Sequence, residues 1–242
     1  MPEGPSILIL KEMLKPFEGK KVITVSGNSK IDIQRIKGKK IISLQSWGKH
    51  LLICFKYFFI RIHLLMYGTY RINERKETDP RLRLTFTKGE INFYTCSIIL
   101  IEGSPEKVYD MESDILSDSW NPKKAGKKLK ALENTNVCDA LLNQEIFSGV
   151  GNIIKNEVLF LCRIHPKSLV ENLPPKKLKE LIKQAQDYSW NFYTWKKAFE
   201  LRKHWQIYFK KECPRCKIPS KREHFGKGDR WTFYCENCQI KY

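Results

Sequence analysis

The chain has 242 residues, of which 42% are hydrophobic and 12% aromatic, a composition typical of a folded globular protein rather than a disordered one. No run approaches the roughly 18 apolar residues of a membrane helix, and no basic region followed by an apolar stretch marks a secretory signal, so we expect a cytoplasmic protein. Lysine and arginine number 44 against 26 acidic residues, a formal charge of +18, which favours DNA or RNA over a membrane surface as partner.

The chain begins with Met1-Pro2-Glu3-Gly4-Pro5. Removal of Met1, which a small second residue favours, would leave Pro2 as an N-terminal secondary amine. Such an amine can attack an aldehyde-level carbon and form an iminium, and the neighbouring Glu3 could supply or take protons. By itself the pentapeptide is more typical of a disordered, proline-containing terminus.

The first half of the chain has the patterns of a β-rich domain with one helix. Apolar residues at helical spacing predict a helix over 6–14. Short runs of β-branched and aromatic residues predict strands at 41–44, 51–55, 58–65, 82–87 and 91–94, with a hairpin turn at 88–90. We interpret residues 1–120 as a β-sandwich with a flanking N-terminal helix.

The composition changes near residues 119–122, after which helical patterns replace the strand signals. We expect a helical domain over 121–210, with helices at 129–132, 137–143, 153–161 and 176–193. The lysine-rich run 123–130 is also typical of a solvated helix face.

A glycine-rich turn lies between two of these helical patterns. Gly149 and Gly151 permit a tight turn, and Asn152 is a favourable N-cap for the following helix. Backbone N–H groups at such a helix start can bind phosphate. An ordinary helix-to-helix turn explains the same residues equally well.

The last part of the chain contains two Cys-x2-Cys pairs separated by 18 residues, the spacing of a tetrahedral structural zinc site. Free thiols or a redox dithiol pair are remote alternatives. A metal would stabilise a hairpin too short for its own core, so we predict a zinc finger over 211–242. The proposed ligands are Cys213, Cys216, Cys235 and Cys238. The intervening hairpin carries several basic residues, as a nucleic-acid-binding element would.

These features occur together and in order with further matching segments at 47–52, 63–68, 114–118 and 230–239. Over essentially its whole length the chain resembles the Fpg/Nei family of DNA glycosylases, formamidopyrimidine-DNA glycosylase and endonuclease VIII. The resemblance implies an α+β multidomain fold: an N-terminal β-sandwich with a flanking helix, a helix-two-turn-helix domain and a C-terminal four-cysteine zinc-finger hairpin. It also implies one structural zinc ion.

The resemblance further implies a bifunctional DNA glycosylase/AP lyase of base-excision repair. Pro2 would be the nucleophile that attacks C1′ of the damaged nucleotide, and Glu3 would assist opening of the sugar ring. Lys49 matches a phosphate-contacting lysine of the family. The reaction would continue by β,δ-elimination and leave a one-nucleotide gap.

Other positions match the DNA-contacting residues of the family. Asn152 and Arg230 would hold phosphates beside the lesion, while Leu65, Met66 and Tyr67 would fill the void left by an extruded base. For Leu65 and Met66 the alternative is ordinary core packing. The implied partner is damaged DNA, expected to be double-stranded, bound by a monomeric, nucleoid-associated bacterial protein.

The chain also departs from the family pattern. Ser6 stands where family members commonly have a second glutamate, which could slow the proton transfers. Gly4, and the absence of a glycine-rich segment between 195 and 211, favour the endonuclease VIII branch and oxidised pyrimidines. A non-catalytic lesion- or abasic-site-binding protein of the same fold is one alternative function, and a zinc-ribbon nucleic-acid adaptor is another.

Overall fold

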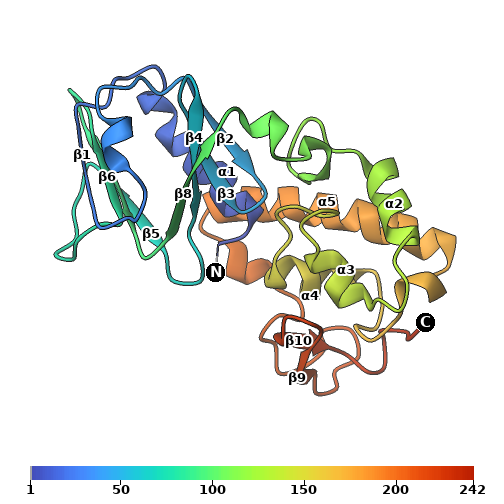
Figure 1. Ribbon diagram of the computed structural model, residues 1–242. Helices are drawn as coiled ribbons and strands as arrows, with labels where there is room; N and C mark the ends of the chain where they lie inside the picture. Colours follow the sequence, from blue (N-terminus) through green and yellow to red (C-terminus); the bar gives the residue numbers. More distant parts are fainter. Residues whose placement is uncertain (1) are drawn as a thin grey trace. The chain divides into compact units, whose positions relative to one another are not determined.

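The computed structural model describes residues 2–242, which form two compact units (Figure 1). The first unit contains Pro2 and residues 6–109, and the second contains residues 3–5 and 110–242. Met1, and with it the prediction that this residue is removed, lies outside the described residues.

The first unit contains two four-stranded antiparallel sheets. In one sheet the strand order is β1-β6-β7-β5, and in the other it is β2-β3-β4-β8. The strands are β1 (Thr24–Ser26), β2 (Ser43–Trp47), β3 (His50–Cys54), β4 (Phe58–His63), β5 (Thr69–Ile72), β6 (Leu82–Thr85), β7 (Glu90–Tyr94) and β8 (Ser97–Glu102).

The core of this unit lies between the two sheets. Leu82 and Leu84 of β6 are buried while the intervening Arg83 is half-buried, the alternation expected of a strand with one face toward the core. Residues of both sheets and of helix α1 (Gly4–Leu14) belong to one apolar cluster. From α1, Ile7 and Leu10 are fully buried, so the helical spacing seen in the sequence is confirmed.

The second unit is built from helices and one hairpin (Figure 1). Its elements are α2 (Pro122–Lys130), α3 (Val137–Leu142), α4 (Asn152–Leu161), α5 (Pro175–Lys197), β9 (Lys221–Phe225) and β10 (Arg230–Tyr234). Helix α4 is the centre of the unit, because it packs against α3, α5 and β10, and nearly all its residues are buried. The hairpin β9–β10 is antiparallel.

Short 3-10 helices lie between these helices and strands. They are Lys15–Phe17, Ile33–Ile36, Pro105–Lys107, Met111–Ser113, Val170–Asn172 and Leu201–His204.

Several predicted boundaries were wrong. The helix predicted over 129–132 is the last turn of α2, which begins at Pro122, where Asn121 caps it through a hydrogen bond to the Lys124 amide. Helix α5 continues to Lys197. The sequence analysis also missed three strands, β1, β5 and β8. The division into domains at 120 and 210 stays a prediction.

Candidate active site and metal centre

The carboxylate of Glu3 lies at the N-terminus of helix α4 and is fully buried. Its oxygens accept hydrogen bonds from the backbone N–H groups of Gly151 (3.1 Å), Ile153 (2.7 Å) and Ile154 (3.3 Å). The first amides of a helix lack intrahelical partners, and the helix dipole favours negative charge there. These donors offset the cost of removing the carboxylate from water.

Glycines permit this close approach. A Cβ atom on Gly151 would lie 2.3 Å from Cδ of Glu3, so any side chain at 151 would displace the carboxylate. The backbone of the next residue makes a second contact with the same turn. The Gly4 amide donates to the carbonyl of Gly149 (2.9 Å), and a Cβ on Gly4 would lie 2.8 Å from Cα of Gly149. The segment 3–5 is therefore held against the turn 149–151 by both its backbone and its side chain.

Two predictions about this turn were wrong. Asn152 is the first residue of α4 rather than its N-cap, and Gly151 at the cap position provides no side-chain hydrogen bond. The anion at the helix start is the carboxylate of Glu3, so the amides expected to bind phosphate are already engaged by the chain itself.

Asparagines on α4 hold the hairpin strand β10. The amide of Asn152, only 6% exposed, donates to the carbonyl of Trp231 (2.9 Å). Asn156 is fully buried; its amide donates to the carbonyl of Asn152 (2.7 Å), and its oxygen accepts from the Phe233 amide (2.7 Å). Arg230, at the start of β10, is exposed beside this anchored segment.

A buried lysine lies in the same interface. Lys155 is fully buried, and its ammonium donates to the hydroxyl of Thr232 (2.8 Å), which is also fully buried. Burial lowers the pKa of Lys155 and raises the pKa of the nearby Cys138 thiol to about 12. The lysine thus adds a further bond between α4 and β10.

Glu157 fixes the segment that follows α5. Its buried carboxylate accepts from the amides of Gln206 (2.9 Å), Ile207 (3.0 Å) and Tyr208 (2.8 Å). Burial raises the pKa of Glu157, while these backbone donors oppose the shift. Helix α4 therefore holds Glu3 through the backbone amides at its start, and it holds the hairpin and the segment 206–208 through buried polar side chains.

The four predicted metal ligands come together. The sulfur atoms of Cys213, Cys216, Cys235 and Cys238 all lie within 4.8 Å of one another. The sulfurs of Cys213 and Cys238 are 3.8 Å apart, and four thiolates around a tetrahedral ion with 2.3 Å bonds would be separated by about the same distance. The cluster can therefore hold a metal ion.

The surroundings of the cluster also fit a metal centre. The Asn237 amide nitrogen lies 3.3 Å from the sulfur of Cys216, so it can donate to a bound thiolate. Cys213 and Cys235 are fully buried and belong to one apolar cluster with Phe160 of α4 and Phe233 of β10. A metal at this position would link the hairpin to the end of α4.

In the first unit, Lys49 is half-buried in the turn between β2 and β3. The ring of Trp47 stacks on His50 (5.7 Å between centroids), and His50 meets His63 edge-on (5.1 Å). Burial, with smaller contributions from His63 and from nearby cations including Lys49, lowers the pKa of His50 to about 3. His50 is therefore neutral, and the cations beside it are Arg61 and Lys49.

Leu65, Met66 and Tyr67 form an exposed turn after β4. Their exposed fractions are 46%, 47% and 77%, so core packing is wrong as an explanation of Leu65 and Met66. The turn is tight: Leu65 has a φ of 53°, and the Gly68 amide donates to the carbonyl of Leu64 (2.7 Å). Three adjacent exposed apolar side chains form an apolar surface, and such a surface is typical of an interaction site.

The structure thus divides the predicted site residues between the units. Glu3, Asn152, Arg230 and the four cysteines belong to the second unit, while Pro2, Lys49 and the turn 65–67 belong to the first. Pro2 is half-buried and lies two residues before the start of α1 at Gly4.

The sequence analysis missed Lys155, Asn156, Glu157 and His50. The first three interrupt the otherwise apolar helix Asn152–Leu161, and consecutive polar residues in a buried helix were the available signal. His50 had no such signal.

Sequence models of two domains match the chain. Residues 1–96 match the formamidopyrimidine-DNA glycosylase N-terminal domain, and residues 111–189 match the formamidopyrimidine-DNA glycosylase H2TH domain. A crystal structure of Lactococcus lactis formamidopyrimidine-DNA glycosylase, non-covalently bound to DNA with an AP site, superimposes with a TM-score of 0.86 over 99% of this chain and 100% of that chain. At 22% identity this similarity confirms the predicted fold.

Curated relatives are more similar in sequence. Endonuclease 8-like 3 of Mus musculus is 34% identical over 205 residues, and Endonuclease 8-like 2 of the same organism is 39% identical over 165 residues. The matches cover 81% and 66% of this chain, but only 34% and 48% of those proteins. The chain therefore spans about a third to a half of these relatives. Their source gives no support to the predicted bacterial origin.

Among the helices formed by residues 2–242, none is long and apolar enough to cross a membrane.

Proposed function

The chain belongs to the Fpg/Nei family of DNA glycosylases, and we propose that it is a bifunctional DNA glycosylase and AP lyase of base-excision repair. The observation that supports this most strongly is the position of Glu3. Glu3 directly follows Pro2 in the chain. Its carboxylate is buried and accepts hydrogen bonds from three backbone amides. A carboxylate held so close to an N-terminal secondary amine can exchange protons with it.

The proposed reaction begins at the amine of Pro2 after removal of Met1. The nitrogen attacks C1′ of the damaged nucleotide, and the bond from C1′ to the base breaks; the base leaves with the bonding electrons and takes a proton from water. Glu3 takes the proton that the amine loses and returns it to O4′ as the sugar ring opens, which leaves an iminium between Pro2 and C1′. The three backbone hydrogen bonds favour this role by holding the carboxylate in a fixed position at the residue next to the Pro2 amine.

The iminium makes the neighbouring C2′ hydrogens acidic. Loss of one of them expels the 3′ phosphate, and a second elimination expels the 5′ phosphate. Hydrolysis of the remaining iminium then frees Pro2, and a one-nucleotide gap remains in the DNA. Ser6 lies in α1 at a position where a further carboxylate is common in the family, so we expect these proton transfers to rely on Glu3 and water.

Contacts with duplex DNA would come from both units. Lys49 and Arg230 would neutralise phosphates, in keeping with the formal charge of +18, and Asn152 is a further proposed phosphate contact. The exposed turn 65–67 would occupy the space of the extruded base. We propose that the protein does this as a monomer.

We propose that the four-cysteine cluster holds a single zinc ion with a structural role. All four tetrahedral positions would be filled by protein, so the ion would supply no open coordination site. Its role would be to hold the hairpin and Arg230 in place.

Oxidised pyrimidines are the proposed substrates. The similarity to Endonuclease 8-like proteins, at 34% and 39% identity, supports this. Gly4 also favours the endonuclease VIII branch, because the leucine that the formamidopyrimidine-DNA glycosylase branch tends to have at this position would overlap the turn at Gly149.

An incision assay tests the proposal. Protein confirmed by mass to lack Met1 is incubated with 5′-labelled and 3′-labelled duplexes that contain thymine glycol, 8-oxoguanine or an abasic site. We expect cleavage that leaves phosphates on both sides of a one-nucleotide gap, fastest on thymine glycol among the base lesions. Binding without cleavage of any duplex would instead favour the non-catalytic lesion-binding alternative.

A further inference from the structure

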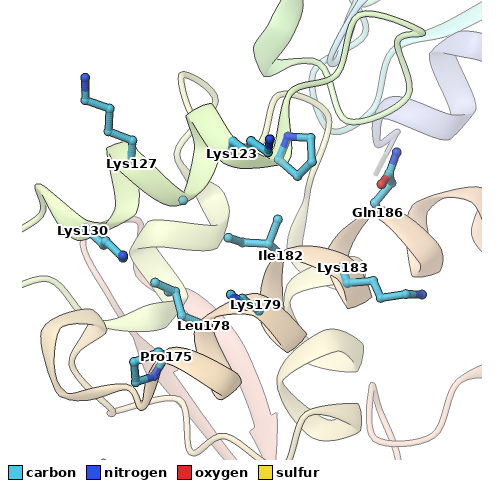
Figure 2. A pocket seen from close by; sticks show the side chains of 11 residues that line it. Lys123, Lys127, Lys130, Pro175, Leu178, Lys179, Ile182, Lys183 and Gln186 are labelled. Carbon is cyan, nitrogen blue, oxygen red and sulfur yellow. The ribbon is translucent and has the colours of Figure 1, made fainter.

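Helices α2 and α5 enclose a groove with a volume of about 590 Å³ (Figure 2). Its floor is apolar: Leu178 and Ile182 of α5 are 6% and 7% exposed and face the groove beside Gly126 of α2. Five lysines line the groove, three from α2 and two from α5. They are Lys123, Lys127, Lys130, Lys179 and Lys183.

A glycine in the interior of α2 keeps the groove open. Glycine costs a helix about 1 kcal/mol relative to alanine. A Cβ atom on Gly126 would lie 3.4 Å from Cδ1 of Ile182, so any longer side chain would extend over the floor. The glycine is not required by a positive φ, since it lies within a regular helix. Its effect on the structure is the space that it leaves.

The lysines of α2 divide into two sets. Lys124 and Lys128 point away from the groove and form ion pairs with Asp110 (2.8 and 2.9 Å), and Lys124 also pairs with Glu112 (2.7 Å). Within residues 2–242, no carboxylate pairs with the groove lysines Lys123, Lys127 and Lys130.

The two lysines on the α5 side differ from each other. Lys183 pairs with Asp187 along the helix, whereas Lys179 has no acidic partner in the described part of the chain. Four of the five groove lysines therefore present uncompensated positive charge around an apolar floor.

This surface is distinct from the candidate active site. Neither Asn152 nor Arg230 lines the groove. Two features also make it a poor phosphate site. Pro122 and Pro175 occupy the first positions of α2 and α5, where they remove an N–H donor from each helix start, and an apolar floor contributes nothing to a phosphate backbone.

We propose that the groove between α2 and α5 binds an acidic amphipathic helix of a partner protein. Large apolar side chains of that helix would cover Leu178 and Ile182, and its flanking carboxylates would face the unpaired lysines on both sides. This is the helix-in-groove mode of recognition with complementary charge. It does not depend on the glycosylase chemistry.

The test uses a fluorescein-labelled peptide of about 18 residues, long enough to form an isolated helix. Leucines repeat along one face at helical spacing, with glutamates on both sides and alanines elsewhere. A scrambled peptide of the same composition lacks the apolar stripe, and a second control replaces the leucines with glutamines at unchanged charge. Binding to the full chain is measured by fluorescence anisotropy.

Protein variants locate the binding. Lys179→Glu removes a groove lysine, while the matched control Lys196→Glu makes the same charge change at an exposed position farther along α5. Gly126→Leu fills the groove at constant charge and increases helix propensity, so its thermal unfolding temperature should not fall. We expect Lys179→Glu and Gly126→Leu to weaken binding of the striped peptide about tenfold relative to Lys196→Glu.

Three results would overturn the proposal. The first is that the striped and scrambled peptides bind the protein equally well, or that neither peptide binds it. The second is equal affinity of the groove variants and Lys196→Glu for the striped peptide. The third is displacement of the peptide by undamaged duplex DNA together with weaker duplex binding by Lys179→Glu than by Lys196→Glu, which would make the groove a nucleic-acid contact.

Discussion

At the scale of single residues, the candidate chemistry depends on the pairing of Glu3 with Gly151. The glutamate contributes the carboxylate, and the glycine makes room for it, because a Cβ on Gly151 would overlap the carboxyl group. Neither residue is informative alone in the sequence. Together they explain why a chain whose first residues could be disordered begins with an ordered, buried contact.

Replacement of Gly151 should therefore uncouple Glu3 from helix α4. We expect Gly151→Ala to lower kcat/KM for incision at an abasic site at least about tenfold, because the carboxylate is displaced from the amides that hold it. Gly126→Ala is the matched control, since Gly126 lies within helix α2 and a Cβ there would make only an ordinary contact, 3.4 Å from Cδ1 of Ile182. Single-turnover incision that is equally fast in both variants would show that the position of Glu3 does not matter.

His50 makes the stability of the first unit depend on pH. Burial lowers its pKa from 6.5 to about 3, so the folded state excludes a proton that the unfolded chain binds. The stabilisation is present above pH 6.5 and is lost as the pH falls toward 3. At pH 5 this one group should reduce the free energy of unfolding by about 2 kcal/mol relative to pH 7.

Urea unfolding of the wild type and His50→Phe at both pH values measures this contribution. Phenylalanine keeps an aromatic ring against Trp47 but cannot bind a proton. The wild type should lose more stability between pH 7 and pH 5 than the variant does. The same pH dependence in both proteins would place the effect elsewhere, for example at His63, whose pKa is also lowered by burial.

At the scale of elements, helix α4 positions the hairpin β9–β10 through its buried polar side chains. We expect Asn156→Leu, which has similar volume but no hydrogen-bonding groups, to leave the Phe233 amide unpaired and to destabilise the protein by about 2 kcal/mol. Duplex binding should weaken because β10, the strand that carries Arg230, loses a contact that anchors it on α4.

Asn191→Leu, at an exposed position of α5, is the matched control. Thermal unfolding and duplex affinity of the two variants are compared with those of the wild type. If Asn156→Leu behaves like Asn191→Leu in both measurements, α4 does not organise the hairpin.

Metal removal should act on the hairpin before the rest of the fold. The four cysteines anchor its base, and two of them pack on Phe160 of α4, so a chelator should abolish duplex binding and change the fluorescence of Trp231. Added zinc should restore both, with a single equivalent per chain by elemental analysis. Full duplex affinity in metal-free protein would contradict a structural role for the site.

At the scale of the whole molecule, the parts predictable from sequence are those with local signals. The apolar runs at 51–55 and 91–94 correctly predicted strands, and the spacing of Ile7 and Leu10 correctly predicted a helix. The paired cysteines correctly predicted the four-cysteine cluster. The order of motifs gave the family.

The remainder depends on contacts that no local pattern encodes. Asn152 has a side chain suited to an N-cap, but the Glu3 carboxylate accepts the hydrogen bonds at the start of α4. The Asn152 side chain donates to the carbonyl of Trp231 instead. Strand β8 was overlooked although Ser97–Glu102 is rich in isoleucine, and strands as short as β1 are formed by pairing alone. The buried Lys155 finds its partner 77 residues away.

The central claim is that the N-terminal amine of Pro2, assisted by Glu3, forms a covalent intermediate with DNA. Its most direct test is sodium borohydride trapping on a duplex with an abasic site, followed by proteolysis and mass mapping of the adduct. We predict an adduct on the peptide that begins with Pro2, greatly reduced in Pro2→Gly. An adduct on another residue, or none from protein that lacks Met1 and binds the duplex, would contradict the claim.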